Sequence, residues 1–223
     1  MSKKCQECGL VNFSKAEDCG RCGFGLGESG QAASTTNSNL TMIIRRAAIF
    51  LMICLFVIAG FYLSLIGSAK SLAYEDKQIV NSSILILKDS GFADEVFLLQ
   101  NLAAYRSTDN WLNASVEKEN AYAATNFPFE IVTIYPDFFD FPADDVERAA
   151  ILLHEAKHLA GNDEKEAYEF VWRNRKQIGW SKAVYGRSLV WQNIRKQTKE
   201  TVPELFACPE FDMGDCTETA FQN

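Results

Sequence analysis

An uncharged run of twenty residues, from Ala47 to Ile66, constrains the fold of this chain more than any other feature. A helix rises about 1.5 Å per residue, so a run of this length spans about 30 Å, the thickness of the hydrocarbon core of a bilayer. A mostly polar segment precedes the run and no small-x-small cleavage site is evident, which argues against a signal peptide. We therefore predict a transmembrane helix over residues 42–67, with the lipid bilayer as its partner.

The charges around this run predict its orientation. Arg45 and Arg46 adjoin its N-terminal end, whereas the other end is followed by Lys70 and then by Lys77, which lies beside Glu75 and Asp76. The positive-inside rule then places the N-terminus in the cytoplasm and the larger C-terminal part outside it, in a periplasm or the exterior. Residues 1–46 carry six basic and four acidic side chains, which leaves 16 basic and 25 acidic side chains for the rest. This excess of negative charge argues against a nucleic-acid partner.

Four of the seven cysteines form two C-x-x-C pairs near the N-terminus: Cys5 with Cys8, and Cys19 with Cys22. Four thiolates complete a tetrahedral shell that leaves no position for a substrate, so the spacing predicts a structural zinc site. Rubredoxin-like iron and a pair of disulfides are the alternatives. The segment resembles bacterial zinc ribbons and the zinc finger of Ran-binding-protein type, including Asn12 between the pairs and a glycine after each pair.

We accordingly expect a zinc ribbon over residues 1–27 and a flexible linker over residues 28–41, which is rich in small and polar residues. So short a segment can hardly have a core without its metal. A reducing cytosol would keep the four thiols available as ligands, in agreement with a cytoplasmic N-terminus. A cytoplasmic partner of the ribbon is expected, but the sequence does not identify it.

The only two histidines, His154 and His158, lie four residues apart, with Glu155 between them. On a helix, residues at i and i+4 share a face, so both imidazoles can bind one zinc ion while Glu155 acts as a general base on a water molecule. A pair of histidines packed on a helix is the alternative. The flanking pattern, with Asp144 as the N-cap and Glu147 closing a capping box, predicts a helix from about residue 145 to residue 160.

A catalytic zinc ion usually takes three protein ligands, so one more is expected after His158. The acidic candidates that follow are Asp163, Glu164, Glu166 and Glu169. We favour Glu164, because it begins the next helix just beyond the Gly161 bend. Glu166 has a competing role, since it would close a second capping box with Asp163 as the N-cap.

These residues resemble the zincin superfamily of zinc metallopeptidases. In the metzincin pattern H-E-x-x-H-x-x-G-x-x-H, Gly161 falls on the glycine and Glu164 on the third ligand, although this ligand is a histidine in metzincins. Deuterolysin-like peptidases are similar, but Tyr168 lies one residue later than their tyrosine. Gluzincins use a glutamate, often followed three residues later by a small residue, which Ala167 matches. The resemblance implies a catalytic zinc ion and a role for Tyr168 as a hydrogen-bond donor to the reacting carbonyl, with packing in the helix as the alternative.

Beyond the apolar run, the pattern predicts an α+β domain over residues 71–223, mostly helical with a short β-sheet. Helices are expected over residues 72–87, 93–105, 162–177 and 181–199, and a strand over residues 130–135. This strand could bind an extended peptide by strand addition. The three tryptophans that follow the expected metal helix are predicted to pack in the core or near the membrane, with a substrate-binding cage as the alternative. Cys208 and Cys216 could form a disulfide in an oxidising compartment, with two free thiols as the alternative.

The sequence thus predicts a single-pass membrane zinc metallopeptidase that hydrolyses a peptide or protein substrate outside the cytoplasm. Two alternatives stay open. In one, the zincin-like domain is a non-catalytic sensor or adaptor. In the other, the same chemistry acts as a metal-dependent amidase on peptides of the cell wall.

Overall fold

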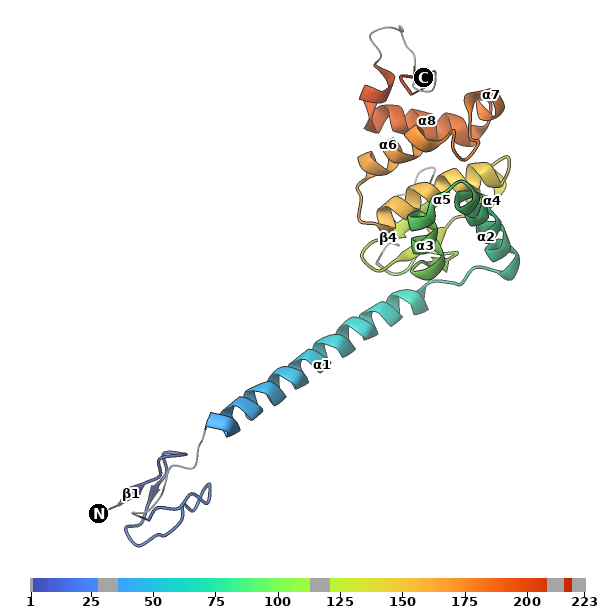
Figure 1. Cartoon of the computed structure of the whole chain (residues 1–223). Coiled ribbons are helices and arrows are strands. Elements are labelled where there is room, and N and C mark those ends of the chain that lie inside the picture. The colour runs from blue at the N-terminus through green and yellow to red at the C-terminus, as the bar shows by residue number, and fades with distance from the viewer. Residues whose placement is uncertain (1, 28–35, 113–120, 208–214, 218–223) are drawn as a thin grey trace. The chain divides into compact units, whose positions relative to one another are not determined.

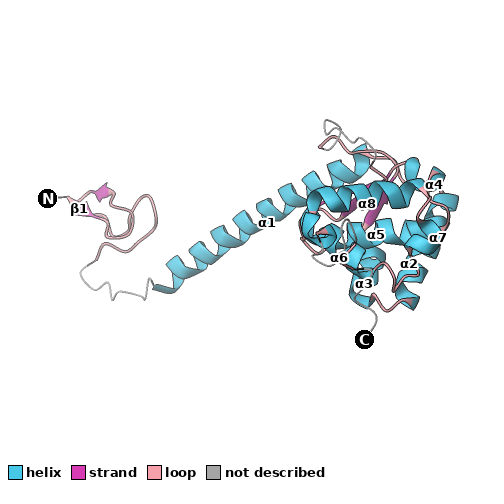
Figure 2. Cartoon of the chain, turned by 90° about the horizontal axis from the view of Figure 1, so that it is seen from above, coloured by secondary structure: helices cyan, strands magenta, loops and turns pink. Residues whose placement is uncertain are grey.

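The computed structural model describes residues 2–27, 36–112, 121–207 and 215–217 (Figure 1). The chain divides into two units, Met1–Ile58 and Ala59–Asn223, and each is described by itself. The first unit contains the four N-terminal cysteines and most of a long helix. The second contains the end of that helix and a mixed domain of helices and short strands (Figure 2).

The N-terminal segment is built from two similar knuckles. Strands β1 (Lys3–Lys4) and β2 (Val11–Asn12) pair antiparallel and flank the first knuckle. In each knuckle a glycine with φ of +71°, Gly9 or Gly23, donates its backbone N–H to the carbonyl of the first cysteine of the pair, at 3.0 and 2.9 Å. This left-handed conformation favours glycine, which explains why the residue follows each C-x-x-C pair.

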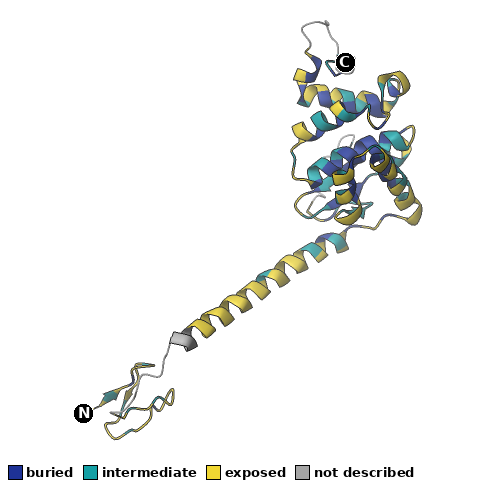
Figure 3. Ribbon diagram, in the orientation of Figure 1, coloured by how far each residue is buried: buried dark blue, intermediate teal, exposed yellow. Residues whose placement is uncertain are grey.

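Helix α1 (Thr36–Ser68) contains the predicted apolar span. Its stretch Leu40–Ser68 is long and apolar enough to cross a membrane, and most of its side chains are exposed (Figure 3). The prediction of a spanning-length apolar helix over residues 42–67 is therefore confirmed in its helical form and its composition. The orientation stays a prediction.

The second unit is mostly helical, as predicted, and α5 lies at its centre. Helices α2, α3 and α6 and strand β4 all pack against α5, whose buried residues lie on several faces. After α1, the helices of the second unit are α2 (Tyr74–Asp89), α3 (Ala93–Asn101), α4 (Asp137–Asp140), α5 (Asp145–Leu159), α6 (Glu164–Asn174), α7 (Lys182–Tyr185) and α8 (Leu189–Thr201), followed by the 3-10 helix η1 (Pro203–Phe206).

Two predicted helices differ from the structure. The helix expected over residues 93–105 ends at Asn101, because Ala104 donates its N–H to the carbonyl of Glu130 at 2.7 Å and begins a strand. The helix expected over residues 181–199 is divided into α7 and α8. At Gly186 a Cβ atom would lie 2.5 Å from the carbonyl oxygen of Lys182, and Ser188 then caps α8 through the N–H of Trp191.

A three-stranded sheet of order β3-β5-β4 packs beside α5. Strand β3 (Ala104–Arg106) is parallel to β5 (Ile131–Ile134), and β4 (Ala123–Asn126) is antiparallel to it. The prediction that β5 accepts an added strand is wrong, because both of its edges are already paired. Among the described strands of this sheet, the outer positions belong to β3 and β4.

The predicted packing of the three later tryptophans is confirmed. Trp172, Trp180 and Trp191 are at most 2% exposed, and their ring centroids lie 4.8 to 6.0 Å apart. The guanidinium of Arg175 lies 4.5 Å from the ring of Trp172 and forms a buried ion pair with Asp215 at 2.8 Å. This cluster ties residues 215–217 to the second unit.

Candidate functional site

Helix α5 has the cap that the sequence predicts, with one difference. The Asp144 carboxylate accepts hydrogen bonds from the N–H groups of Val146 and Glu147, at 2.9 and 3.3 Å. Glu147 does not complete a box with Asp144, since its carboxylate accepts from the N–H of Ala143 at 2.9 Å. The helix ends at Leu159, and Gly161, with φ of +84°, turns the chain toward α6.

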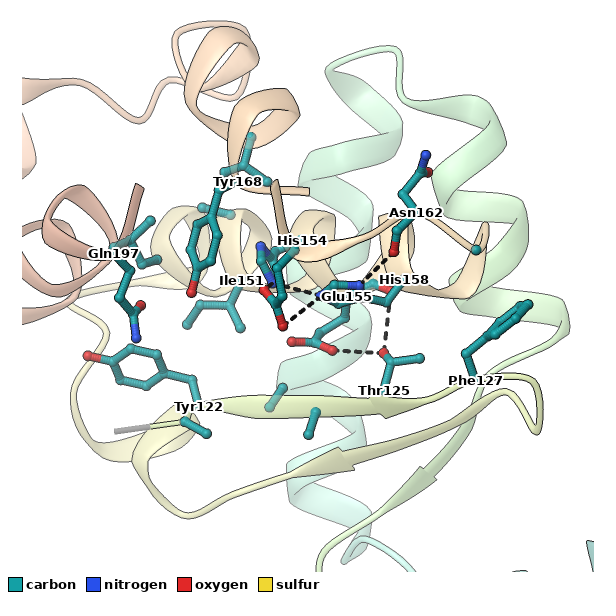
Figure 4. A pocket seen from close by; sticks show the side chains of 18 residues that line it. Tyr122, Thr125, Phe127, Ile151, His154, Glu155, His158, Asn162, Tyr168 and Gln197 are labelled. Atoms are coloured by element: carbon teal, nitrogen blue, oxygen red, sulfur yellow. Dashed lines mark hydrogen bonds and ion pairs between the residues drawn. The ribbon is translucent and has the colours of Figure 1, made fainter. Parts of the chain in front are cut away.

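The structure brings three of the predicted site residues together (Figure 4). The Nε2 atoms of His154 and His158 lie 3.0 Å apart, on one face of α5. The two carboxylate oxygens of Glu164, the first residue of α6, lie 3.3 Å from Nε2 of His154 and 3.4 Å from Nε2 of His158. The arrangement offers one donor atom from each residue around a common point.

These separations fit a zinc ion. Bonds of 2.0–2.1 Å in a tetrahedral shell place neighbouring ligand atoms about 3.3 Å apart. The two Nε2 atoms are close to this separation, and each of them lies at about this distance from a different oxygen of Glu164. Nδ1 of His158 lies 3.0 Å from the carbonyl oxygen of Asn162, which can hold the ring with its proton on Nδ1. Nε2 then keeps its lone pair for a metal.

The electrostatics of the three groups also favour a cation between them. Hydrogen bonds from His154 and His158 hold the pKa of the Glu164 carboxyl far below its usual range. Burial lowers the pKa of His158, but its contacts with Glu164 and with the Asn162 carbonyl outweigh this and raise the pKa to about 9. At neutral pH the metal-free His158 ring therefore carries a proton that a metal ion would have to displace.

We expect the affinity of this cluster for Zn²⁺ to rise about tenfold per pH unit between pH 6.5 and pH 9. The His158 pKa is raised, so the metal-free ring carries a proton up to about pH 9, and zinc must displace that proton. Competition with a chromophoric chelator measures the affinity, in a Cys8→Ser variant that lacks the N-terminal site. An affinity that stays constant over this range would contradict the expectation.

Glu155 lies beneath the cluster, where it is 5% exposed. Its Oε2 accepts a hydrogen bond from the hydroxyl of Thr125 on β4, at 2.7 Å. This hydrogen bond fixes the orientation of Oε2, while the other carboxylate oxygen of Glu155 stays available to the pocket (Figure 4). Thr125 carries no sequence signal of its own, because it reaches α5 only when β4 pairs with β5.

Tyr168 on α6 lines the same pocket. Its ring centroid lies 4.5 Å from that of His154, and part of the side chain packs against the core. Burial and then the charges of Glu164 and Glu155 raise the pKa of Tyr168 above its ordinary value, so its hydroxyl stays protonated and can donate a hydrogen bond. Tyr168 thus both contacts His154 in the pocket and packs against the core, so neither observation chooses between its two predicted roles.

The other acidic candidates lie elsewhere. Asp163 and Glu166 form the predicted capping box, which is confirmed: Glu166 accepts from the N–H of Asp163 at 3.2 Å, and Asp163 accepts from that of Glu166 at 2.9 Å. Glu169 is paired with Arg173 at 2.7 Å. Among the candidates, the geometry therefore brings only Glu164 to the two histidines.

A pocket of about 420 Å³ surrounds this cluster. Strand β4 forms one wall, and α5, α6 and α8 contribute the others. Sequence reasoning missed several of its residues, which come together only through the fold: Tyr122, Thr125, Phe127, Asn162 and Gln197. Figure 4 shows Tyr122, Tyr168 and Gln197 at one end of the pocket and Phe127 at the other.

The four N-terminal cysteines form a second cluster. Their Sγ atoms lie within 4.8 Å of one another, and the pairs Cys5–Cys22 and Cys8–Cys19 are 3.6 and 3.5 Å apart. Zinc–sulfur bonds of about 2.3 Å place neighbouring sulfurs about 3.8 Å apart, so the cluster fits one metal ion, zinc among them. Asn12 lies 3.6 Å from the sulfur of Cys19 through its amide nitrogen, and its amide oxygen accepts from Gly20.

One thiol of this cluster ionises easily. The backbone N–H of Arg21 is the largest of several hydrogen bonds that lower the pKa of Cys19 to about 6. A thiolate is therefore available at neutral pH to begin metal binding.

The predicted pair Cys208–Cys216 is described only at one end. Cys216 is disulfide-bonded, whereas Cys208 lies outside the described residues. The thiols of the N-terminal cluster and of Cys54 are free.

The chain was compared with models of known protein families, with curated proteins and with solved structures, and it matches none of them.

Proposed function

We propose that the second unit is a zinc-dependent peptidase of the zincin type. The observation that carries the proposal is that His154, His158 and Glu164 bring their ligand atoms as close together as ligands of one zinc ion would be, with the carboxylate of Glu155 beside them in one pocket. A buried carboxylate next to three convergent metal ligands is the constellation that metal-assisted hydrolysis requires.

In the proposed reaction, this chain's residues bind the peptide and move the protons. A bound zinc ion would lower the pKa of a water molecule to about 7 and polarise the scissile carbonyl. Glu155 takes a proton as the water attacks the carbonyl carbon. It then gives that proton to the leaving amine as the peptide bond breaks. Tyr168 donates its hydroxyl hydrogen to the carbonyl oxygen, where negative charge develops.

Strand β4 is the proposed binding edge for the substrate backbone. It lines the pocket, and its only strand partner among the described residues is β5. An extended peptide can pair with this edge by main-chain hydrogen bonds and so pass in front of His154 and Glu155. Tyr122, Phe127 and Gln197 then lie where side chains of the peptide would be recognised.

Thr125 is a positioning residue in the proposed reaction. Thr125→Val should lower kcat about tenfold, because the Glu155 carboxylate loses a hydrogen bond of about 1.5–3 kcal/mol that orients it. Thr125→Ser keeps the hydroxyl and should restore kcat. A folded Thr125→Val enzyme with the kcat of the wild type would contradict this role.

Membrane attachment and orientation are part of the proposal. The apolar helix, the basic pair Arg45–Arg46 and the free thiols of the N-terminal cluster support a cytoplasmic N-terminus with a structural zinc ion. The disulfide at Cys216 supports an oxidising compartment for the second unit. The ribbon would then face an unidentified cytoplasmic partner.

The test of the proposed function is hydrolysis of a peptide library by the full chain in detergent, read by mass spectrometry. Cleavage that requires zinc and is lost after chelation supports the peptidase. If the zinc-loaded protein cleaves no peptide, the adaptor alternative takes its place. If it cleaves only cross-linked cell-wall peptides, the amidase alternative does.

A further inference from the structure

The C-terminal end of α1 is fixed to the second unit by side-chain contacts. Trp111 donates from its indole nitrogen to Ser64 and from its backbone to the Ser68 hydroxyl, both at 3.2 Å. Its ring meets that of Phe61 edge-on, with centroids 5.4 Å apart. Leu65, between these contacts, is fully buried. The last turns of α1 therefore pack against the domain.

The backbone continues this attachment without a free linker. Lys70 donates to the Thr108 hydroxyl at 2.9 Å and accepts from the N–H of Ser107 at 2.8 Å. Ser71 then bridges to Arg106 at the end of β3. The chain thus passes from the helix directly onto the edge of the sheet, and Leu72 enters the core. The domain is held at the end of the helix.

These contacts lie at the depth where the helix would leave the bilayer. Phe61 and Ser64 belong to the uncharged run that ends at Ile66, and at 1.5 Å per residue they lie about 7 and 3 Å before its end. The ring of Phe129 also contacts Phe61, with centroids 5.3 Å apart. An aromatic ring with a polar N–H, such as that of Trp111, is typical of the boundary between hydrocarbon and headgroups.

The turn over residues 126–129 connects this boundary to the pocket. Phe127 lines the pocket, and two residues later Phe129 contacts α1. Two residues of extended chain cover at most about 7 Å, and the N–H of Phe129 bonds to the carbonyl of Asn126 at 2.9 Å, which tightens the turn. One end of the pocket therefore lies a single turn from the transmembrane helix.

Exposed apolar side chains surround this region. Trp111, Leu112 and Phe127 are 51%, 40% and 57% exposed, and Leu63 on the helix is 65% exposed. Trp111 among them contacts Phe61 of α1, a helix whose apolar side chains the bilayer would cover. Lipid at the boundary is thus the occupant that this surface fits.

We propose that the aromatic residues Trp111, Phe127 and Phe129 hold the pocket at the membrane surface. The substrate is then a membrane-anchored polypeptide that is cut close to the point where it leaves the bilayer. The inference rests on the proposed peptidase function and on the transmembrane assignment. The membrane, rather than a side-chain pocket alone, would select the substrate.

The contact of Trp111 with lipid is tested by tryptophan fluorescence of the full chain in phosphatidylcholine vesicles. The lipid is used with and without bromine on the acyl chains near the headgroups. Trp111 is the one tryptophan of four that is half exposed, so bromine should quench up to about a quarter of the emission. Trp111→Phe should abolish this quenching, because the other three are buried in the core. Equal emission in both lipids would overturn the proposed contact of this surface with the membrane.

The substrate class is tested in the same vesicles with a peptide library attached to a model transmembrane helix. Through a short spacer, cleavage should be at least about tenfold faster than for the same library free in solution, and it should fall as a Gly-Ser spacer is lengthened. Rates that are independent of attachment and spacer would overturn the substrate class but leave the peptidase standing. If neither form is cleaved while Trp111 is quenched, the proposed function fails and this substrate class with it.

Discussion

Replacing Glu155 by glutamine is expected to lower peptide turnover by about 10²–10⁴-fold while the protein stays folded and keeps its zinc. The amide retains the size of the side chain and can still meet the Thr125 hydroxyl, but it cannot accept the proton of the attacking water. His154, His158 and Glu164 are unchanged, so metal binding should persist. Turnover of a cleaved library peptide and elemental analysis of the same sample measure both results.

Glu166→Gln is the matched control, because it makes the same chemical change on the capping box of α6 and outside the pocket. It should leave kcat within about twofold and lower stability slightly. A Glu155→Gln protein that is folded, metal-loaded and as active as the wild type would contradict the assigned base.

Loss of metal is expected to unfold the N-terminal ribbon completely. Among residues 2–27, which the structure describes, the only buried apolar side chains are those of Cys5 and Cys19, so almost no hydrophobic core remains once the metal is gone. Structural zinc in sites of this kind contributes about 10–16 kcal/mol of apparent binding free energy, far more than so short a segment can otherwise supply. Cys8→Ser should therefore remove the hydrogen-exchange protection of amides that are bonded within the knuckles, such as those of Gly9 and Gly23.

The second unit provides the contrast in the same experiment. Its core around α5 does not involve these cysteines, so its amides should keep their protection. Cys54→Ser, which changes a cysteine on α1 outside the cluster, is the matched control and should leave the ribbon protected. A ribbon that stays protected in Cys8→Ser would show that it folds without its metal site.

The local parts of both sites could be predicted from the sequence because they depend on short spacings. The i, i+4 relation of His154 and His158 requires only a helix, and the two knuckles require only C-x-x-C followed by glycine. Glu164 could be favoured over Glu166 by the same kind of argument, since the Asp163 cap engages the carboxylate of Glu166.

The rest depends on tertiary pairing, which short patterns do not encode. Thr125 contacts Glu155 only because β4 takes the edge of the sheet, and β4 itself has no strong strand signal. Residues 104 and 105 read as the end of a helix, but pairing with β5 draws them into a strand that continues to Arg106. The expectation that β5 offers a free edge failed for the same reason, since its two partners are short and lie on both sides of it.

We expect this chain to bind two zinc ions at independent sites, and elemental analysis of the purified chain measures that number. The expected content is two zinc ions per chain, one in Cys8→Ser, and one in either His158→Ala or Glu164→Ala, with Glu166→Ala as the control that keeps both. A folded wild-type chain with a single zinc ion that persists in His158→Ala and is lost in Cys8→Ser would contradict the catalytic site, and with it the peptidase.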